Sequence, residues 1–290
     1  MPLSKGVRYM LLATFLFSCM NALVKLVPHI PAAEIVFFRS LVSLVMSYAV
    51  LKSQRVYVWG NNRKLLIARG LTGAVALVLY FVLLQQIPLA AAVTLQFITP
   101  IFTAILGVVL LRERMRVWQW IFFAISFGGM LVINGFDARI DTVHIVMGVV
   151  AAVGAGLAYT IIRKLNYSEH PLVIMLYFPL VTLPITGIYS AFHWEMPQGW
   201  DWAVLLGVGT LTQFAQYFMT KSYQAEEVSK VASLNYLSIV YALSMGFIFF
   251  GETFNVVTYL GMALVVTGVL LNVLYKQRIS SAKKKQPART

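Results

Sequence analysis

The chain is poor in charge and has almost no cysteine. Of its 290 residues only 11% are charged, and just 10 are Asp or Glu, whereas soluble domains average about 25% charged residues. The single cysteine, Cys19, excludes an internal disulfide, so packing alone must hold the fold. Hydrophobic residues make up 60% of the chain. This composition indicates a protein whose solvent is lipid.

Signatures of catalysis and of nucleic-acid binding are also missing. The four histidines lie near predicted loops, and no glycine-rich phosphate loop is present. A net charge of +13 would suggest nucleic acid as the partner of a soluble protein, but here the cations lie in short loops between apolar runs. We therefore expect no enzyme, no nucleic-acid partner and no cofactor.

Ten apolar stretches are long enough to cross a bilayer. About 20 residues of helix span the hydrocarbon core, where every backbone amide must be bonded internally. The loops between the stretches are short, so neighbouring helices should run antiparallel. The fold class is therefore an all-α membrane protein of ten transmembrane helices, at residues 7–27, 32–51, 66–86, 89–111, 117–134, 143–162, 171–192, 202–223, 228–250 and 255–275.

The placement of Lys and Arg predicts the orientation, because loops rich in these residues stay in the cytoplasm. With the amino terminus inside, 20 of the 23 cations are cytoplasmic, Lys25 and Arg139 are outside, and Arg39 lies within a span. Both termini are then cytoplasmic, in the inner (plasma) membrane of a bacterium. Residues 277–290 form a basic tail that we expect to be disordered, either solvated or in contact with anionic membrane lipid.

The two halves of the chain match at an offset of 139 residues. Residues 1–138 and 139–276 are therefore predicted to be two five-helix repeats. Because five is odd, the second repeat enters the membrane inverted, an architecture typical of secondary transporters. The polar and glycine matches include Lys25 with Lys164, Glu113 with Glu252, and Gly129 with Gly268.

The fourth span and its copy also resemble a known family. Thr-Pro-Ile-Phe-Thr-Ala at 99–104, with Leu-Leu-Arg-Glu at 110–113, resembles the fourth-helix signature of EamA-type carriers in the drug/metabolite transporter (DMT) superfamily. Residues 237–252 resemble the same signature in a second copy. There Ile239 stands where the first copy has Pro100, which predicts a second copy without the helix bend.

Two further segments extend the resemblance. Residues 34–39 are similar to the start of the family's second helix. Together with residues 69–113, they look most like bacterial S-adenosylmethionine uptake carriers and animal solute carriers of family 35 group G. The resemblance implies ten helices, a central cavity between the halves, and solutes such as amino acids, nucleosides, vitamins and drugs.

Polar side chains recur at helical spacing within four spans, and such groups tend to face a bundle interior or a cavity. The alternative is that they bond helix to helix, and that the tyrosines only pack. The candidates for a substrate cavity are Asn21, Lys25, Arg39, Tyr80, Gln96, Thr99, Tyr159, Gln213, Gln216, Tyr217, Asn235 and Tyr236.

Two of these candidates are charged. Arg39 lies seven residues into its span, and it pairs with helix ends or a solute carboxylate, or else snorkels to the outer interface. Lys25 either snorkels or pairs with Glu34. All ten carboxylates lie in loops or at helix ends, which favours facilitated diffusion or exchange over proton-driven pumping. Glu113 and Glu252 are predicted to be gate or cap residues.

The sequence thus predicts a secondary transporter that moves a small organic metabolite, amino-acid-like or nucleoside-like, by alternating access. The alternatives are an exporter of drugs and metabolites, a membrane-embedded lipid enzyme, and a channel or scaffold subunit. The expected partners are the solute and membrane lipid, and a homodimer is left open.

Overall fold

A computed structural model describes residues 4–111, 117–165, 168–225 and 233–285 of the chain. Within these ranges the regular structure is helical and contains no strand. The elements are α1 (Lys5–Leu26), α2 (Ala32–Ser53), α3 (Arg63–Gln86), α4 (Leu89–Gln96), α5 (Thr99–Leu111), α6 (Val117–Phe136), α7 (Thr142–Leu165), α8 (Pro171–Phe192), α9 (Asp201–Ala225), the 3-10 helix η1 (Ser233–Tyr236), α11 (Leu237–Phe250) and α12 (Val256–Lys285).

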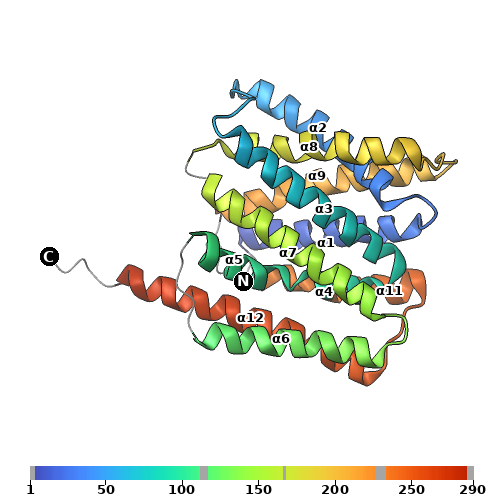
Figure 1. Ribbon diagram of the computed structural model, residues 1–290, viewed down its shortest axis with the longest axis vertical. Coiled ribbons are helices and arrows are strands. Elements are labelled where there is room, and N and C mark those ends of the chain that lie inside the picture. The colour runs from blue at the N-terminus through green and yellow to red at the C-terminus, as the bar shows by residue number, and fades with distance from the viewer. Residues whose placement is uncertain (1–3, 112–116, 166–167, 226–232, 286–290) are drawn as a thin grey trace.

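The described elements form ten antiparallel passes between two ends of one bundle (Figure 1). Helices α4 and α5 together make one pass, and η1 and α11 make another. Lys25, near the end of α1, is ion-paired with Glu252, just before α12 begins. We call this the Lys25 end. The start of α1 and the end of α12 therefore lie at the opposite end, which we call the terminal end.

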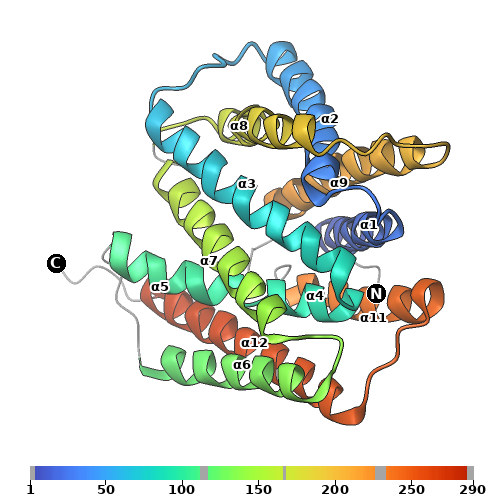
Figure 2. The same ribbon diagram turned by 45° about the vertical axis from the view of Figure 1, so that its right-hand side comes forward.

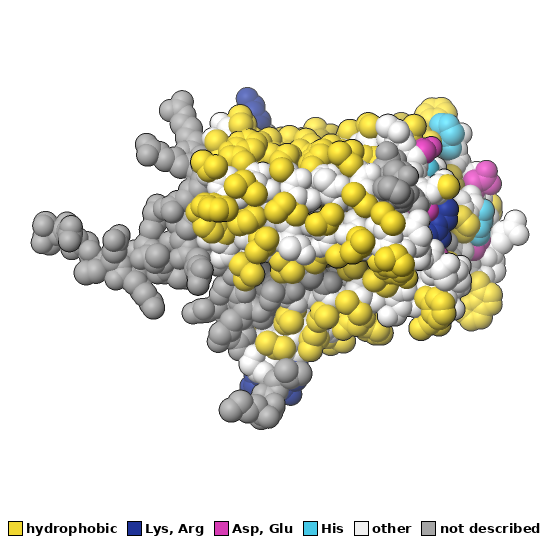
Figure 3. Space-filling view, turned by 90° about the horizontal axis from the view of Figure 1, so that it is seen from below, with side chains coloured by type: hydrophobic (Ala, Val, Ile, Leu, Met, Phe, Trp, Pro, Cys, Tyr) yellow, Lys and Arg dark blue, Asp and Glu magenta, His cyan; other side chains and the backbone are white. Residues whose placement is uncertain are grey.

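Length and composition fit a membrane. Six described helical segments are long and apolar enough to cross a bilayer, and three shorter apolar helices accompany them. Hydrophobic side chains cover the length of the bundle face seen in Figure 3, whereas acidic and histidine side chains gather at one end and Lys or Arg side chains lie at both ends. The prediction of an all-α membrane protein with ten helical passes therefore agrees with the structure.

The helices pack in reciprocal pairs. Helix α2 packs against α8 at one edge of the bundle, and α6 packs against α12 at the other (Figures 1 and 2). At the centre α4 lies beside α11, and residues 89–95 of α4 are all buried. Further contacts join α1 with α9 and α11, and α7 with α3 and α5.

Glycine allows the closest of these approaches, between α6 and α12. A Cβ atom added at Gly129 would lie 2.6 Å from the Gly261 carbonyl oxygen. The Ser126 hydroxyl donates to the Val265 carbonyl at 3.2 Å across the same interface. Small residues serve this purpose in membrane helices, because close backbone contact replaces the hydrophobic driving force that lipid does not supply.

Both central passes depart from regular α-helix, at positions 139 residues apart. Between α4 and α5, the amides of Phe97 and Ile98 bond three residues back, and Pro100 has no amide to donate. The other pass changes from η1 to α11 between Tyr236 and Leu237. The second copy thus has a 3-10 segment with no proline in it. The predicted absence of a helix bend at Ile239 stays a prediction.

Two helix boundaries differ from the prediction. Helix α3 begins at Arg63 rather than at residue 66, and Asn62 caps it by accepting from the Leu65 amide at 3.3 Å. Helix α12 continues to Lys285 instead of ending at residue 275. Lys, Arg, Gln and Ala in this basic extension are good helix formers, so a helix that leaves the apolar core need not stop there.

Candidate functional site: polar clusters in the bundle interior

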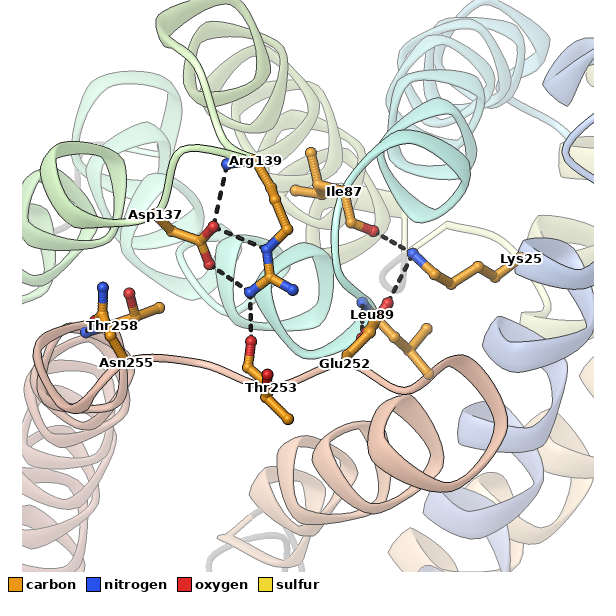
Figure 4. A network of polar contacts seen from close by, with 9 residues as sticks. All are labelled: Lys25, Ile87, Leu89, Asp137, Arg139, Glu252, Thr253, Asn255 and Thr258. Atoms are coloured by element: carbon orange, nitrogen blue, oxygen red, sulfur yellow. Dashed lines mark hydrogen bonds and ion pairs between the residues drawn. The ribbon is translucent and has the colours of Figure 1, made fainter.

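An ion pair holds three parts of the chain together at the Lys25 end. The Lys25 ammonium lies 2.9 Å from Glu252 Oε1 and donates to the Ile87 carbonyl at 2.5 Å. Glu252 Oε2 accepts from the Leu89 amide at 2.8 Å (Figure 4). The two side chains are only 13% and 7% exposed. The pair therefore fastens α1 and the loop before α12 to the α3–α4 junction.

Two glycines shape the loop that presents Glu252. The Glu252 amide donates to the Gly246 carbonyl at 2.9 Å, and a Cβ atom at Gly246 would lie 2.5 Å from Glu252 Oε2. Gly251 has a φ of +61°, a left-handed conformation that favours glycine. Glycine at both positions therefore allows the carboxylate to fold back over the end of α11 and reach Lys25.

A second ion pair braces the same end. Arg139 donates from Nε and Nη2 to the Asp137 carboxylate at 2.9 and 2.8 Å, and from Nη2 to the Thr253 carbonyl at 2.7 Å (Figure 4). These bonds hold the pKa of Asp137 below its usual value of 3.8, although partial burial opposes the shift. The α6–α7 loop is thereby tied to the segment that follows Glu252.

This arrangement predicts a defined pH dependence for Asp137→Asn. A carboxyl whose pKa is lower in the folded state contributes stability above its unfolded pKa and loses that contribution as the pH falls through the folded pKa. We expect Asp137→Asn to unfold at a lower temperature than the parent protein at pH 7, with the gap narrowing as the pH is lowered below the usual Asp pKa of 3.8. Arg139→Gln should show the same gap at pH 7. A gap that persisted unchanged in acid would contradict this role.

The predicted pairing of Lys25 with Glu34 is wrong, and so is snorkelling by Lys25. Lys25 pairs instead with Glu252, which is remote in sequence. Glu34 is buried, and its carboxylate accepts from the Glu195 amide at 3.1 Å. Proximity in sequence suggested Glu34, whereas the partner comes from the other half of the chain. Glu113, the other predicted gate residue, lies outside the described residues.

Arg39 lies in the interior and does not snorkel to the interface. Arg39 is only 6% exposed, and its Nε donates to the Thr212 hydroxyl of α9 at 3.2 Å. The guanidinium carbon is 5.8 Å from the ring centroids of both Phe81 and Phe178. Aromatic faces favour a cation at such distances, so α3 and α8 both contribute to its environment.

Arg69 is the interior cation that the sequence analysis missed. Counting charges by loop assigned it to the cytoplasm, although it lies within the predicted span 66–86 and within α3. Its guanidinium carbon is 4.4 Å from the Phe178 ring centroid. Nε and Nη1 are buried and have no hydrogen-bond partner among the described residues. Its position inside an apolar run was the signal that could have identified it.

Between α1 and α3, the Asn21 side chain lies close enough to the Tyr80 hydroxyl for a hydrogen bond. Asn21 Oδ1 is itself buried without a partner among the described residues, and so is the Thr99 hydroxyl. Other hydroxyls in the predicted polar stripes bond back to their own helices, such as Thr103 to the Thr99 carbonyl at 2.9 Å. Asn21, Tyr80 and Thr99 are thus the neutral candidates with interior placements.

The remaining candidates are scattered. Gln96 is half-buried at the end of α4, and Gln213 approaches the Ser47 hydroxyl at 3.4 Å between α9 and α2. Tyr217 is 55% exposed and lies on α9 near the exposed Phe214 and the half-buried Phe218. Gln216 and Asn235 are half-buried and have partners, Tyr159 is half-exposed, and the Tyr236 side chain lies outside the described residues.

Two surface grooves flank α8, and neither contains a predicted site residue. One has a volume of about 420 Å³ and is bordered by Ile67, Leu71 and Val181 between α3 and α8. The other, of about 530 Å³, includes Phe37, Leu44 and Leu180 between α2 and α8. Both linings are almost entirely apolar, as expected of surface that faces lipid.

A profile of the EamA-like transporter family matches this chain twice, at residues 4–135 and at residues 142–274. The chain belongs to the EamA-like transporter family. The predicted resemblance to EamA-type carriers of the DMT superfamily is therefore confirmed. The protein is a multi-pass membrane transporter and not an enzyme.

Named relatives cover most of the chain. The pseudopaline exporter CntI of Pseudomonas aeruginosa (strain UCBPP-PA14) is 33% identical over 274 residues, which cover 92% of this chain and 95% of the exporter. Solute carrier family 35 member G1 of Mus musculus is 30% identical and covers 84% and 72% of the two chains. The S-adenosylmethionine uptake transporter of Rickettsia prowazekii (strain Madrid E) is 24% identical and covers 68% and 67%.

A solved crystal structure has the same fold as this EamA-like chain. Its TM-score is 0.61 at 18% identity, with 94% of this chain and 98% of the solved chain covered. At that identity the likeness concerns the fold alone.

Proposed function

We propose that this EamA-like protein is a secondary transporter that moves a small organic metabolite across the bacterial inner membrane by alternating access. Residues 1–138 and 139–276 are its inverted five-helix repeats, and both termini are cytoplasmic. The relatives include one named exporter and one named uptake transporter, each for a small organic molecule. A carrier without a coupled ion moves its solute down the prevailing gradient, so direction need not follow from the fold.

Reciprocal helix contacts support the two repeats. At an offset of 139 residues α1 corresponds to α7, α3 to α9, and α5 to α11. Helix α1 packs against α9 and α11, and α7 correspondingly packs against α3 and α5. This exchange is expected of two halves related by a twofold axis. Because α1 starts at the terminal end and α7 at the Lys25 end, that axis lies across the bundle, as inversion requires.

One difference between the two ends carries the proposal. Tyr159 follows Gly148, Ala152 and Ala155 along one face of α7, and those three residues are buried. Tyr159 is nevertheless 51% exposed, whereas Met20, its counterpart 139 residues earlier, is 4% exposed at the other end of the bundle. In an alternating-access carrier this difference corresponds to a conformation that is closed at the Lys25 end and open at the terminal end.

Exchange of metabolites across liposome membranes tests the proposal. The purified protein would be reconstituted, the vesicles loaded with a bacterial metabolite extract, and the loss of each compound followed by mass spectrometry. We expect at least one organic metabolite to leave at a saturable rate that depends on the protein. A non-saturable flux would indicate a channel instead. No protein-dependent movement of any metabolite would overturn the proposal.

Two half-buried amides, Gln96 and Gln213, give a more local prediction once a solute is identified. Gln96→Ala and Gln213→Ala should each lower the initial rate of uptake by about threefold to tenfold, because a hydrogen bond to the solute contributes about 0.5–1.5 kcal/mol. Expression should stay unchanged. Gln198→Ala, in the exposed loop before α9, is the control. Unchanged uptake in Gln96→Ala and Gln213→Ala would remove these amides from the site.

A further inference from the structure

Two arginines approach the same aromatic ring from different ends of the bundle. Arg39 is in the second turn of α2, which begins at the Lys25 end, and Arg69 is in the second turn of α3, which begins at the terminal end. Both guanidinium groups lie against Phe178 of α8, at 5.8 and 4.4 Å from its centroid. The side chains therefore converge from α2 and α3 on one place in the interior.

Neither arginine has a carboxylate among the described residues to neutralise it. No described Asp or Glu forms an ion pair with either side chain, and the ion pairs of the described residues lie near the ends of the bundle. Both guanidinium groups lie against the Phe178 ring, so their like charges repel each other. Burying like charges without a counter-ion is unfavourable, and inside a membrane such residues mark sites on solute pathways.

The unused hydrogen-bond donors of the two arginines indicate the chemical group that would bind between them. Nε and Nη1 of Arg69 are buried with no partner among the described residues, whereas Arg39 uses Nε on the Thr212 hydroxyl. Guanidinium groups bind carboxylate and phosphate oxygens through pairs of parallel hydrogen bonds. An oxyanion placed between the two side chains would accept these bonds and offset their repulsion.

Arg69 lies in the part of α3 that is nearest the terminal end. Tyr159 is half-exposed on α7, the helix that packs against α3. An anion that entered at the terminal end would therefore meet Tyr159 and the two arginines in the same region.

We propose that Arg39 and Arg69 together bind the carboxylate or phosphate group of the transported solute, so that the solute class is small organic anions. This inference rests on the proposed transport function. It adds Arg69 to the site and assigns Arg39 a partner. Phe178 serves as the platform on which both guanidinium groups are positioned.

Anion-dependent thermal stability tests the site without a known solute. The purified protein would be heated with increasing succinate in one arm and inorganic phosphate in the other, with sodium chloride at matched ionic strength as the reference. We expect at least one of the two anions to raise the unfolding temperature by mass action. Arg39→Gln and Arg69→Gln should each weaken that anion's half-saturation at least tenfold. Arg63→Gln, exposed on α3 one and a half turns earlier, should not.

A second measurement keeps the proposal testable if either variant folds poorly. Without succinate or phosphate, Arg69→Met should unfold at a higher temperature than the parent protein, because an uncompensated buried charge is removed. No anion effect in the parent protein, or equal effects in Arg63→Gln and Arg69→Gln, would overturn the anion site. If liposomes instead carry solutes that lack an oxyanion and Arg69→Gln transports them at the parent rate, the inference fails while the transport function stands.

Discussion

Replacing Glu252 with glutamine is expected to destabilise the protein by about 3–5 kcal/mol, because it removes one partner of a largely buried ion pair. The Lys25 ammonium would keep its bond to the Ile87 carbonyl but lose the negative charge 2.9 Å away. The glutamine side chain could still accept a hydrogen bond from the Leu89 backbone amide. The loss of stability would therefore report mainly the removal of the negative charge. A fall in the midpoint of thermal unfolding measures it.

A double-mutant cycle separates this pair from its surroundings. Lys25→Met alone should also destabilise the protein, because it strands the Glu252 carboxylate. The double variant should lose clearly less than the sum of the two single losses, since neither charge is then left unpaired. Glu195→Gln, an exposed acid at the same end, is the control. Additive losses would show that Lys25 and Glu252 do not act together.

Gly129→Ala is expected to have the second large effect, a loss of stability. Gly128→Ala, at the neighbouring position, should change stability in the opposite direction. A Cβ atom at Gly129 would meet the Gly261 carbonyl at 2.6 Å and the Val265 amide at 2.7 Å, and backbone atoms cannot yield cheaply. Overpacking of this kind costs about 1–3 kcal/mol. This exceeds the 0.5–1 kcal/mol or so that alanine gains over glycine inside a helix, so the net change should be destabilising.

Gly128→Ala is the matched control on the same helix. Nothing lies within 4 Å of a Cβ atom there, so the helix-propensity gain should stand alone and the protein should be at least as stable as its parent. The two variants would be compared by thermal unfolding under identical conditions. Equal stability would mean that α6 and α12 do not approach as closely as the structure shows.

The helices follow closely from the sequence, because apolar runs of about 20 residues admit one structure in lipid. The irregular segments of the two central passes do not follow from the sequence in this way. In the first copy, Pro100 indicated the break between α4 and α5. The second copy has a 3-10 segment at Ser233–Tyr236, and that segment contains no proline. Whether the backbone bonds to the third or the fourth residue there depends on packing between the halves, which a residue pattern does not encode.

Interior placement was predicted better than partnership. Arg39 and Asn21 were recognised as polar residues inside spans, and the structure buries both. Pairing with Glu252 was not foreseen for Lys25, because the partner comes from the other half of the chain. Arg69 was missed because charges were assigned loop by loop. A cation in the second turn of α3 was therefore counted with the cytoplasmic loop before that helix.

The most direct test of alternating access compares the two ends of the interior. Single cysteines at positions 20 and 159, in a chain with Cys19→Ala, would be labelled in membranes by an impermeant maleimide from each side. We expect Tyr159→Cys to react from the cytoplasmic side and Met20→Cys to be protected. Adding Glu252→Gln should expose Met20→Cys to the outside while slowing the reaction of Tyr159→Cys. Equal labelling of both positions in the parent background, or reactivities that rise together, would contradict the account.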